Sequence, residues 1–340
     1  MDQAALVQAL LRPEAYPHRP QKVELVQTHI SMVFLTGDYV YKVKKPVDLG
    51  FVDYSTLEKR KHFCHQEVLL NKRACPDIYL GVVTVVETNG GVSVEGSGDA
   101  IEYAVKMRQL PEHTTMEHLL GTNQVSGDMV ERVARRVAEF HRKAETNDSI
   151  AGYGDVSMVG TNTGENFDQT ERYIGVTISR DSYDAIRAYT EGFLQENGPL
   201  FRKRMRDGRI RDCHGDLHAA HICFINGICI YDCIEFNERF RYGDVASEVA
   251  FLAMDLDCRG RPDLSARFVE AYVAETGDRE LVELLSFYKC YRAYVRGKVE
   301  GLKLDDPLVS AEEKERVAGI ARQYFDLAAS YAQGQDGGAG

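Results

Sequence analysis

The stretch that decides the fold runs from Cys213 to Asn237 and reads CHGDLHAAHICFINGICIYDCIEFN. Its first part is polar, and it turns apolar at Ile222, which predicts a polar loop that leads into a buried strand. The Asn-Gly pair at 226–227 is a strong signal for a hairpin turn, and the returning strand ends on Asp232. This stretch therefore predicts a loop followed by a two-stranded hairpin.

Two carboxylates stand on either side of this hairpin, Asp216 in the loop and Asp232 at the end of the returning strand. We expect the hairpin to bring them to the same edge, with no basic side chain between them. Two carboxylates held close together raise the pKa of one of them unless a divalent cation lies nearby. Phosphoryl transfer uses this arrangement, because one carboxylate accepts the proton of the substrate hydroxyl and the other holds magnesium.

The loop His214-Gly215-Asp216-Leu217-His218 resembles the H-G-D-L-H catalytic loop of the aminoglycoside phosphotransferase and choline kinase group, relatives of the protein kinases. The resemblance implies an α+β, protein-kinase-like bilobal fold, with a small antiparallel β-sheet lobe that carries one long helix and a larger, mainly helical lobe. It also implies that Asp216 is the catalytic base, that His214 supports the loop and that Asp232 binds the metal. His218 is assigned to substrate binding or support.

Two further segments carry the same resemblance. The segment 242–250 resembles the family's Gly-Asp segment, in which Asp244 would cap a buried helix and help to tie down the catalytic loop. The helix expected over 133–141 resembles the family's L-A-x-L-H helix.

One position in the loop differs from the family pattern, which expects an asparagine as a second metal ligand where this chain has His221. Imidazole is a softer ligand than an amide oxygen, so Mn²⁺ becomes an option beside Mg²⁺.

The chain before Pro111 reads as a different kind of structure from the chain after it. From Val23 to about Leu110 short strands alternate with tight turns, which predicts an antiparallel sheet. One long helix interrupts the strands; it is predicted to begin at Ser55, capped by that side chain and by Glu58 in a capping box. It should end near Arg73.

After Pro111 apolar residues recur at helical spacing, and only the segment 146–166, rich in Gly, Thr, Asn and Ser, is predicted as an irregular loop bordering a cleft. The chain is therefore divided into three parts. They are a nucleotide-binding lobe (1–110), a catalytic and substrate-binding lobe (111–332) and a flexible tail (333–340).

A kinase-like lobe needs a strand lysine for the nucleotide phosphates and a helix glutamate that holds the lysine. Lys42 and Lys44 lie on one face of a predicted strand, and the context of Lys42 is closer to V-A-I-K, so we choose Lys42. Glu67 falls on the apolar stripe of the long helix, where a carboxylate needs a partner. A Lys42–Glu67 pair explains both positions. The alternative is a solvated Glu67 that accepts a hydrogen bond from the Asn71 amide.

Other contacts to ATP are predicted from position along the chain. The turn 28–31 precedes the lysine strand and contains no glycine, so its backbone N–H groups and the Ser31 hydroxyl are expected to meet the phosphates. The strand 103–107 resembles the one that enters the interlobe hinge, where backbone groups near Met107 would meet the adenine.

Composition limits the kinds of molecule that this protein is expected to bind. The formal net charge of the 340 residues is −11, which argues against nucleic acid as a main partner. No apolar run reaches the ~20 residues that cross a bilayer. The eight cysteines form no C-x-x-C pair, so we expect reduced, buried thiols and a cytoplasmic protein. The acceptor, the choice between ATP and GTP and the oligomeric state are left open.

Several charged residues have two interpretations. Glu235 is expected to line the active site, and with Asp255 and Asp257 it would suit a cationic acceptor. The basic stretch 201–206 is interpreted as a surface helix end. Four cations on the helix 281–300 are interpreted as a solvated face, with contact to an acidic substrate or phosphate as the alternative. These are Lys289, Arg292, Arg296 and Lys298.

The sequence thus predicts an ATP-dependent phosphotransferase that acts on a hydroxyl of a small molecule. One alternative is a nucleotide-binding pseudokinase without transfer activity, suggested by His221 and the missing glycine loop. A second alternative is a zinc enzyme that uses His214, His218 and His221, since H-x-x-x-H places ligands one helical turn apart. Gly215 and the strand-like run that follows argue against a helix there.

Overall fold

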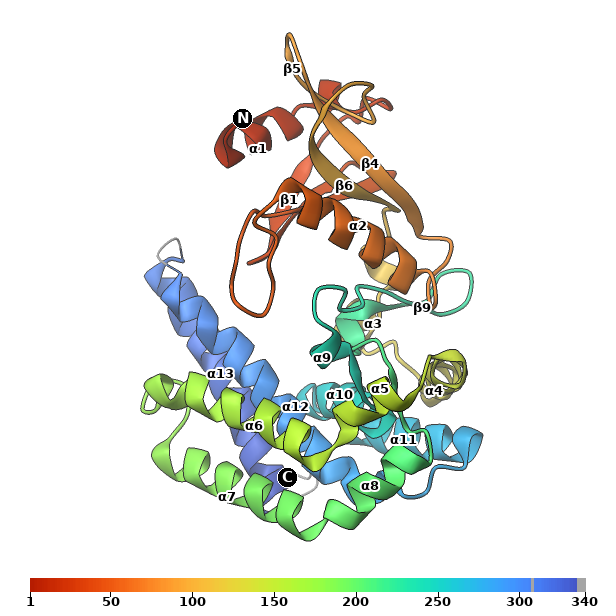
Figure 1. The fold of residues 1–340 in the computed structure, drawn as a ribbon, viewed down its shortest axis with the longest axis vertical. Helices are drawn as coiled ribbons and strands as arrows, with labels where there is room; N and C mark the ends of the chain where they lie inside the picture. The colour runs from red at the N-terminus through yellow and green to blue at the C-terminus, as the bar shows by residue number, and fades with distance from the viewer. Residues whose placement is uncertain (307–308, 335–340) are drawn as a thin grey trace. The chain divides into compact units, whose positions relative to one another are not determined.

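The computed structural model describes residues 1–306 and 309–334. The predicted tail 333–340 lies outside the described residues from 335 onward. The chain forms two compact units, each with a hydrophobic core of its own (Figure 1). The first unit consists of residues 1–118 and 221–238, and the second of residues 119–220 and the chain from Arg239 onward. The hairpin that follows the H-G-D loop thus groups with the N-terminal residues.

The first unit is built on a six-stranded sheet with the strand order β1-β2-β3-β6-β4-β5. All five neighbouring pairs are antiparallel, as the sequence predicts. The strands are β1 (Glu24–Gln27), β2 (Ser31–Leu35), β3 (Tyr39–Lys44), β4 (Tyr79–Thr88), β5 (Gly91–Val94) and β6 (Ala100–Arg108). The β2–β3 turn contains Gly37 at φ 90°, a left-handed conformation that glycine adopts without a steric cost.

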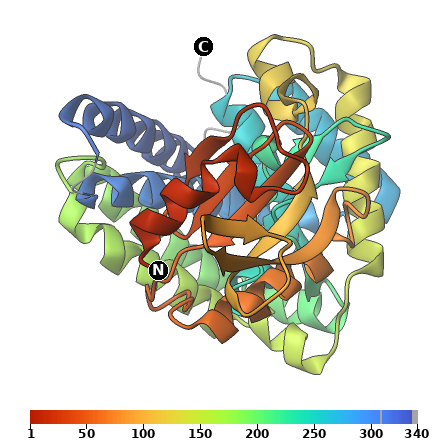
Figure 2. The same cartoon turned by 90° about the horizontal axis from the view of Figure 1, so that it is seen from above.

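Two helices pack on this sheet. Helix α1 (Gln3–Leu10) lies against β5 and contributes Leu6 and Leu10 to a core shared with the sheet (Figure 2). The longer helix α2 (Leu57–Asn71) packs on β6 and β4. Its first turn is capped by Thr56, whose hydroxyl accepts from the Lys59 N–H, so the predicted Ser55 cap is wrong.

The physical reason is a competing local bond. The Ser55 hydroxyl and N–H both donate to Asp53 Oδ1, at 2.6 and 3.0 Å, which holds Ser55 in the preceding loop. Thr56 is then the next residue that can accept from the helix N-terminus.

The second predicted hairpin is also present in the first unit. Strands β8 (Ile222–Cys223) and β9 (Cys229–Ile230) pair antiparallel, and Asn226 and Gly227 take the left-handed φ values of 48° and 116° that a tight hairpin turn demands. One cysteine of β9, Cys229, forms a disulfide with Cys75. The expectation of reduced thiols is therefore wrong for this pair, because two segments 154 residues apart in sequence bring their sulfurs together.

The second unit is mainly helical. Its core contains Phe167, Tyr183, Phe251, Tyr294 and Phe325 from five different helices. The helices are α4 (Gly127–Lys143), α5 (Asp148–Ala151), α6 (Val156–Thr170), α7 (Arg180–Glu196), α8 (Gly198–Arg206), α10 (Val245–Cys258), α11 (Pro262–Thr276), α12 (Leu281–Leu302) and α13 (Ala311–Ala332). Strands β7 (Ile210–Asp212) and β10 (Tyr242–Asp244) form an antiparallel pair. The short helices α3 (Met116–Gly121) and α9 (Glu238–Arg241) include residues of both units.

The segment 146–166 is not an irregular loop. It holds α5, a 3-10 turn at Gly152–Gly154 and most of α6. Asn147 and Asp155 accept hydrogen bonds from the first turns of these helices, so polar residues that suggest a loop act here as caps. Sequence periodicity misses α6 because it carries two glycines and few apolar residues over its first three turns.

No helix in the described ranges has a segment long and apolar enough to cross a membrane.

Candidate functional site

The lysine chosen from the sequence lies between two acidic side chains of the first unit. Lys42 Nζ on β3 is 2.9 Å from Glu67 Oε1 on α2 and 2.6 Å from Asp232 Oδ1. Burial alone would lower the pKa of Lys42, but the Asp232 and Glu67 carboxylates raise it well above its usual value. The predicted Lys42–Glu67 pair is thus present, and Asp232 joins it.

The alternative for Glu67 is wrong. Its side chain is fully buried, and the Asn71 amide donates to the Glu67 backbone carbonyl at 2.8 Å instead of to the carboxylate. The Asn71 side-chain oxygen accepts from the Cys233 N–H at 2.9 Å. Asn71 therefore fixes the chain next to Asp232.

A second lysine enters the same cluster, although the sequence assigns it no role. Lys44 is fully buried, with its Nζ 2.8 Å from Glu67 Oε2, and it also donates to Glu235. The Tyr54 hydroxyl donates to Glu235 at 2.6 Å. Residues two apart on a strand share a face, so the same alternation that exposes Lys42 to Glu67 could have predicted this contact.

Glu235 therefore braces a lysine. Burial alone would raise its pKa, but the ammonium groups of Lys44 and Lys42 and its hydrogen bonds hold the pKa below the usual value. The carboxylate stays ionised inside the unit. Its partners are internal, so it is not a free charge for a cationic acceptor.

Asp232 itself has a strained backbone. Its φ of 63° is left-handed, a conformation that aspartate tolerates better than most side chains, and its N–H donates to the Tyr79 hydroxyl at 3.1 Å. Such outliers persist where the surrounding structure holds them, often at functional sites. His221 Nε2 lies 3.6 Å from Asp232 Oδ2. The Asp232 carboxylate suits Mg²⁺ or Mn²⁺, whereas the His221 imidazole is a softer ligand that Mn²⁺ accepts more readily than Mg²⁺ does.

The residues predicted for the nucleotide lie on the same sheet. Ser31 begins β2, is 1% exposed, and its Oγ is buried without a hydrogen-bond partner among the described residues. The N–H groups of Ile30 and Ser31 donate to Thr28 Oγ1, so these backbone donors are used within the turn. Met107 lies on β6 opposite Val40 of β3.

The H-G-D loop belongs to the second unit. Residues 214–218 are not helical, and Gly215 has φ 86°, which requires glycine. The Asp216 N–H donates to His214 Nδ1 at 3.3 Å, and His218 Nε2 lies 3.6 Å from Asp216 Oδ2. The absence of a helix over these five residues removes the helical H-x-x-x-H geometry on which the zinc hypothesis rests.

Glu248 on α10 holds this loop, and sequence reasoning did not name it. Its carboxylate accepts from the His214 N–H at 2.9 Å and the Gly215 N–H at 2.6 Å, and it pairs with His141 Nε2 at 2.9 Å. Burial alone would raise the pKa of Glu248, but the His141 hydrogen bond and charge and the His214 N–H lower it to about 2.

Two further groups tie the loop to the helices. The Ala219 N–H donates to Asp255 Oδ2 at 2.9 Å, and Arg292 on α12 donates to the Gly215 carbonyl at 3.1 Å. Asp244 accepts from the Ala246 N–H, which caps α10 as the sequence predicts, and it also accepts from Nε and Nη2 of Arg204. The loop therefore rests on a rigid, charge-assisted frame.

The two central carboxylates lie in different units, Asp216 in the second and Asp232 in the first. Their predicted approach to one edge stays a prediction.

Comparison with known proteins places these features in context. No protein-family model matches the chain. It is 31% identical over 312 residues to an uncharacterized protein of Mycobacterium tuberculosis and to its Mycobacterium bovis counterpart. The match covers 92% of this chain and 60% of those proteins, so the chain spans three fifths of the length of these relatives.

Solved structures give a clearer relation. A choline/ethanolamine kinase family protein from Mesorhizobium loti aligns with a TM-score of 0.50 at 11% identity, over 97% of this chain and 99% of that one. The GDP complex of aminoglycoside 2'-phosphotransferase-IIIa aligns with a TM-score of 0.51 at 14% identity, over 90% and 93%. The chain has the protein-kinase-like fold of these small-molecule kinases. The predicted fold class is thereby confirmed.

Within this kinase-like fold, several charged residues have roles that differ from the sequence predictions. The cations of α12 do not form a solvated face, because Lys289 pairs with Asp257 at 2.8 Å and Arg292 bonds the H-G-D loop. Asp255 and Asp257 likewise have internal partners. In the basic stretch 201–206, Arg204 is fully buried against Asp244 and Asp278.

We expect the Glu248 network to make the protein acid-sensitive. The folded-state pKa of about 2 lies below the ordinary value of 4.5, so the stabilisation is complete above that value and is lost as the pH falls toward 2. Glu248→Gln should lower the free energy of unfolding by roughly 3 kcal/mol at pH 7. Urea unfolding at pH 7 and pH 4 measures the difference in the free energy of unfolding between the unsubstituted chain and Glu248→Gln. A difference that is not smaller at pH 4 than at pH 7 would contradict the prediction.

Proposed function

We propose that this protein is an ATP-dependent phosphotransferase that transfers the γ-phosphoryl group to a hydroxyl of a small molecule. The observation that carries the proposal is the position of Lys42, in ion-pair contact with Glu67 on one side and Asp232 on the other. Kinases use such a lysine, helix glutamate and metal-binding aspartate to hold the nucleotide phosphates. The kinase-like fold and the H-G-D loop support the same function.

In this proposal each side chain has one task. Asp216 would accept the proton of the acceptor hydroxyl. The hydroxyl oxygen then bonds to the γ-phosphorus while the bond from that phosphorus to the β,γ-bridging oxygen breaks, and ADP is released. His214 would orient Asp216, and Lys42 would bind the phosphates. Asp232, with His221, would hold Mg²⁺ or Mn²⁺, which neutralises charge on the phosphates.

The nucleotide face would use groups that the fold already provides. The Ser31 hydroxyl is buried without a partner among the described residues, so an incoming phosphate oxygen could accept its hydrogen bond. Backbone groups near Met107 would meet the adenine. The acceptor is a small molecule, and neither nucleic acid nor a membrane is expected as a partner.

The test is ADP formation by the purified chain with ATP or GTP, each with Mg²⁺ and with Mn²⁺, over a panel of hydroxylated metabolites, amino alcohols and aminoglycosides. GTP belongs in the assay because the solved aminoglycoside 2'-phosphotransferase-IIIa is a GDP complex. Nucleotide binding with acceptor-dependent ADP release supports the proposal. Nucleotide binding without turnover under every metal would favour the second candidate, a nucleotide-binding pseudokinase, which His221 beside Asp232 suggests.

We expect His221→Asn to keep or raise activity in Mg²⁺. An amide oxygen is a harder ligand than imidazole and does not titrate near neutral pH. The ratio of the rates in Mg²⁺ and Mn²⁺ should therefore rise in the variant. His62→Asn, on the surface of α2, is the matched control. An inactive variant that no longer responds to either metal would contradict this prediction.

A further inference from the structure

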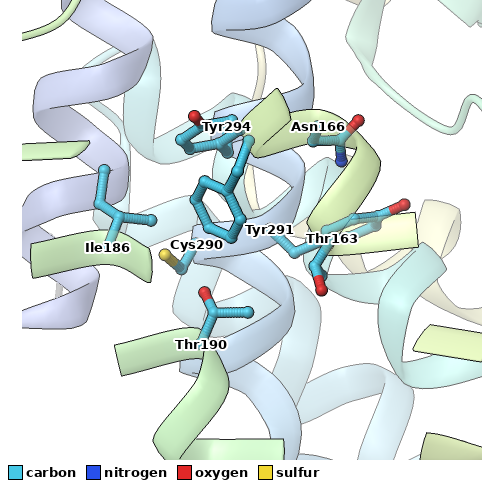
Figure 3. A pocket seen from close by; sticks show the side chains of 8 residues that line it. Thr163, Asn166, Ile186, Thr190, Cys290, Tyr291 and Tyr294 are labelled. Carbon is cyan, nitrogen blue, oxygen red and sulfur yellow. The ribbon is translucent and has the colours of Figure 1, made fainter. Parts of the chain in front are cut away.

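A small cavity lies in the second unit among α6, α7 and α12. Its volume is about 10 Å³, roughly the space of one water molecule, and its polar lining includes Thr163, Asn166, Thr190, Tyr291 and Tyr294. Figure 3 shows these side chains around one space, with Asn166 and Thr163 on α6 and the two tyrosines on α12. The H-G-D site does not use these residues.

Lys298 lies on α12 one turn beyond Tyr294. Its ammonium donates to Asn166 Oδ1 at 2.6 Å and to Gln169 Oε1 at 2.9 Å, both neutral amide oxygens of α6. No carboxylate oxygen within the described part of the chain lies within the 4.0 Å that defines an ion pair with it. A partly buried lysine that is hydrogen-bonded only to neutral amides is less stable as a cation, and burial lowers the pKa of Lys298 to about 8.

The surrounding charges do not compensate for this lysine. Glu165, whose charge raises the pKa of Lys298, takes both guanidinium arms of Arg239, one of them at 2.8 Å. Glu165 and Arg239 cancel each other, so Lys298 leaves the local group with one net positive charge. An anion placed here would make a charge-assisted hydrogen bond in a partly desolvated site.

The same helix reaches the H-G-D loop. Arg292 donates to the Gly215 carbonyl, and the charge of Asp216 acts on Arg296. Six residues separate Arg292 from Lys298, which is ~9 Å along the helix axis at 1.5 Å per residue. An acceptor that meets both Lys298 and the H-G-D loop must span at least this axial separation, which requires its anionic group and its hydroxyl to be several bonds apart.

We propose that Lys298, with Asn166 beside it, binds an anionic group of the acceptor, either a carboxylate or a phosphate. The inference rests on the proposed phosphotransferase function and narrows its substrate class to hydroxylated acids or sugar phosphates. It replaces the sequence-based expectation of a cationic acceptor, since Glu235, Asp255 and Asp257 all have internal partners.

The first experiment measures binding without nucleotide, so it does not depend on catalysis. Glycerate, glucose 6-phosphate, glycerol and choline are titrated against the full chain by calorimetry, and protection of Lys298 from acylation is followed by mass spectrometry. We expect the two anions to bind and to protect Lys298. Lys298→Met should weaken their binding at least tenfold, whereas Lys298→Arg should keep most of it. Lys143→Met, at the exposed end of α4, is the matched control.

The outcomes distinguish a failure of this inference from a failure of the proposed phosphotransferase function. Tighter binding of glycerate indicates that Lys298 binds a carboxylate, and tighter binding of glucose 6-phosphate indicates that it binds a phosphate. Either result supports the site. Binding of choline or glycerol as tight as that of the anions, or anion binding unchanged in a folded Lys298→Met, overturns it. Anion binding through Lys298 without phosphoryl transfer to any acceptor leaves the site intact and counts only against the phosphotransferase function.

Discussion

Replacing Asp216 with asparagine is expected to lower kcat for phosphoryl transfer by about two to four orders of magnitude. The amide keeps the size of the side chain but cannot accept the hydroxyl proton. The loop should keep its shape, because Glu248 and Arg292 hold its backbone. The Kd for ATP should therefore change little, and ADP release with single-turnover analysis separates the two effects.

The matched control is Asp184→Asn, which removes an exposed carboxylate from α7 in the same unit. It should leave kcat within twofold of the unsubstituted chain. If Asp216→Asn retains full acceptor-dependent turnover while Asp184→Asn behaves as expected, Asp216 is not the base and the proposed mechanism is wrong.

The second large effect is expected for Glu67→Gln. Glu67 is buried and bonds two lysines, Lys42 and Lys44, through its two oxygens. Loss of its charge leaves those ammonium groups with fewer counter-charges in a desolvated site, which costs roughly 3–5 kcal/mol. The free energy of unfolding should fall by that amount, and the KM for ATP should rise because Lys42 loses one of the two groups that position it.

Urea unfolding and ATP-dependent initial rates test this prediction. Glu58→Gln, at the exposed start of the same helix, is the control and should lower the free energy of unfolding much less than Glu67→Gln does, because it removes only a solvated charge near the helix N-terminus. Equal effects of the two substitutions would show that the buried pair does not carry the stability assigned to it.

The features predicted correctly from the sequence share one property, in that their evidence is local. The Asn-Gly turn at 226–227 specifies a hairpin through backbone conformation alone, and the alternation of β3 and the stripe of α2 place Lys42 and Glu67 on faces that must be buried together. The H-G-D loop combines a glycine that permits a left-handed φ with polar neighbours. The spacing of apolar residues and the residue types typical of turns were enough to recognise these elements.

The sequence predictions that are wrong concern residues whose structure depends on a competing or distant hydrogen-bond or disulfide partner. Ser55 is a good cap in isolation, but Asp53 takes its hydroxyl, and Thr56 caps α2 instead. Residues 146–166 look like a loop because capping side chains and loop side chains are of the same types. The bond between Cys75 and Cys229 joins segments 154 residues apart, which no local pattern reveals.

Periodicity in the sequence thus predicted an antiparallel sheet followed by helices and the Lys42–Glu67 pair, and the resemblance of the H-G-D loop to that of the small-molecule kinases implied the kinase-like fold. Only the tertiary structure decided which buried charges meet. The contacts of Glu248 with the loop, of Lys44 with Glu235 and of Lys298 with Asn166 each depend on a helix or strand that folding brings to that place. The energy of a buried charge is set by its neighbours in space, and sequence spacing does not record them.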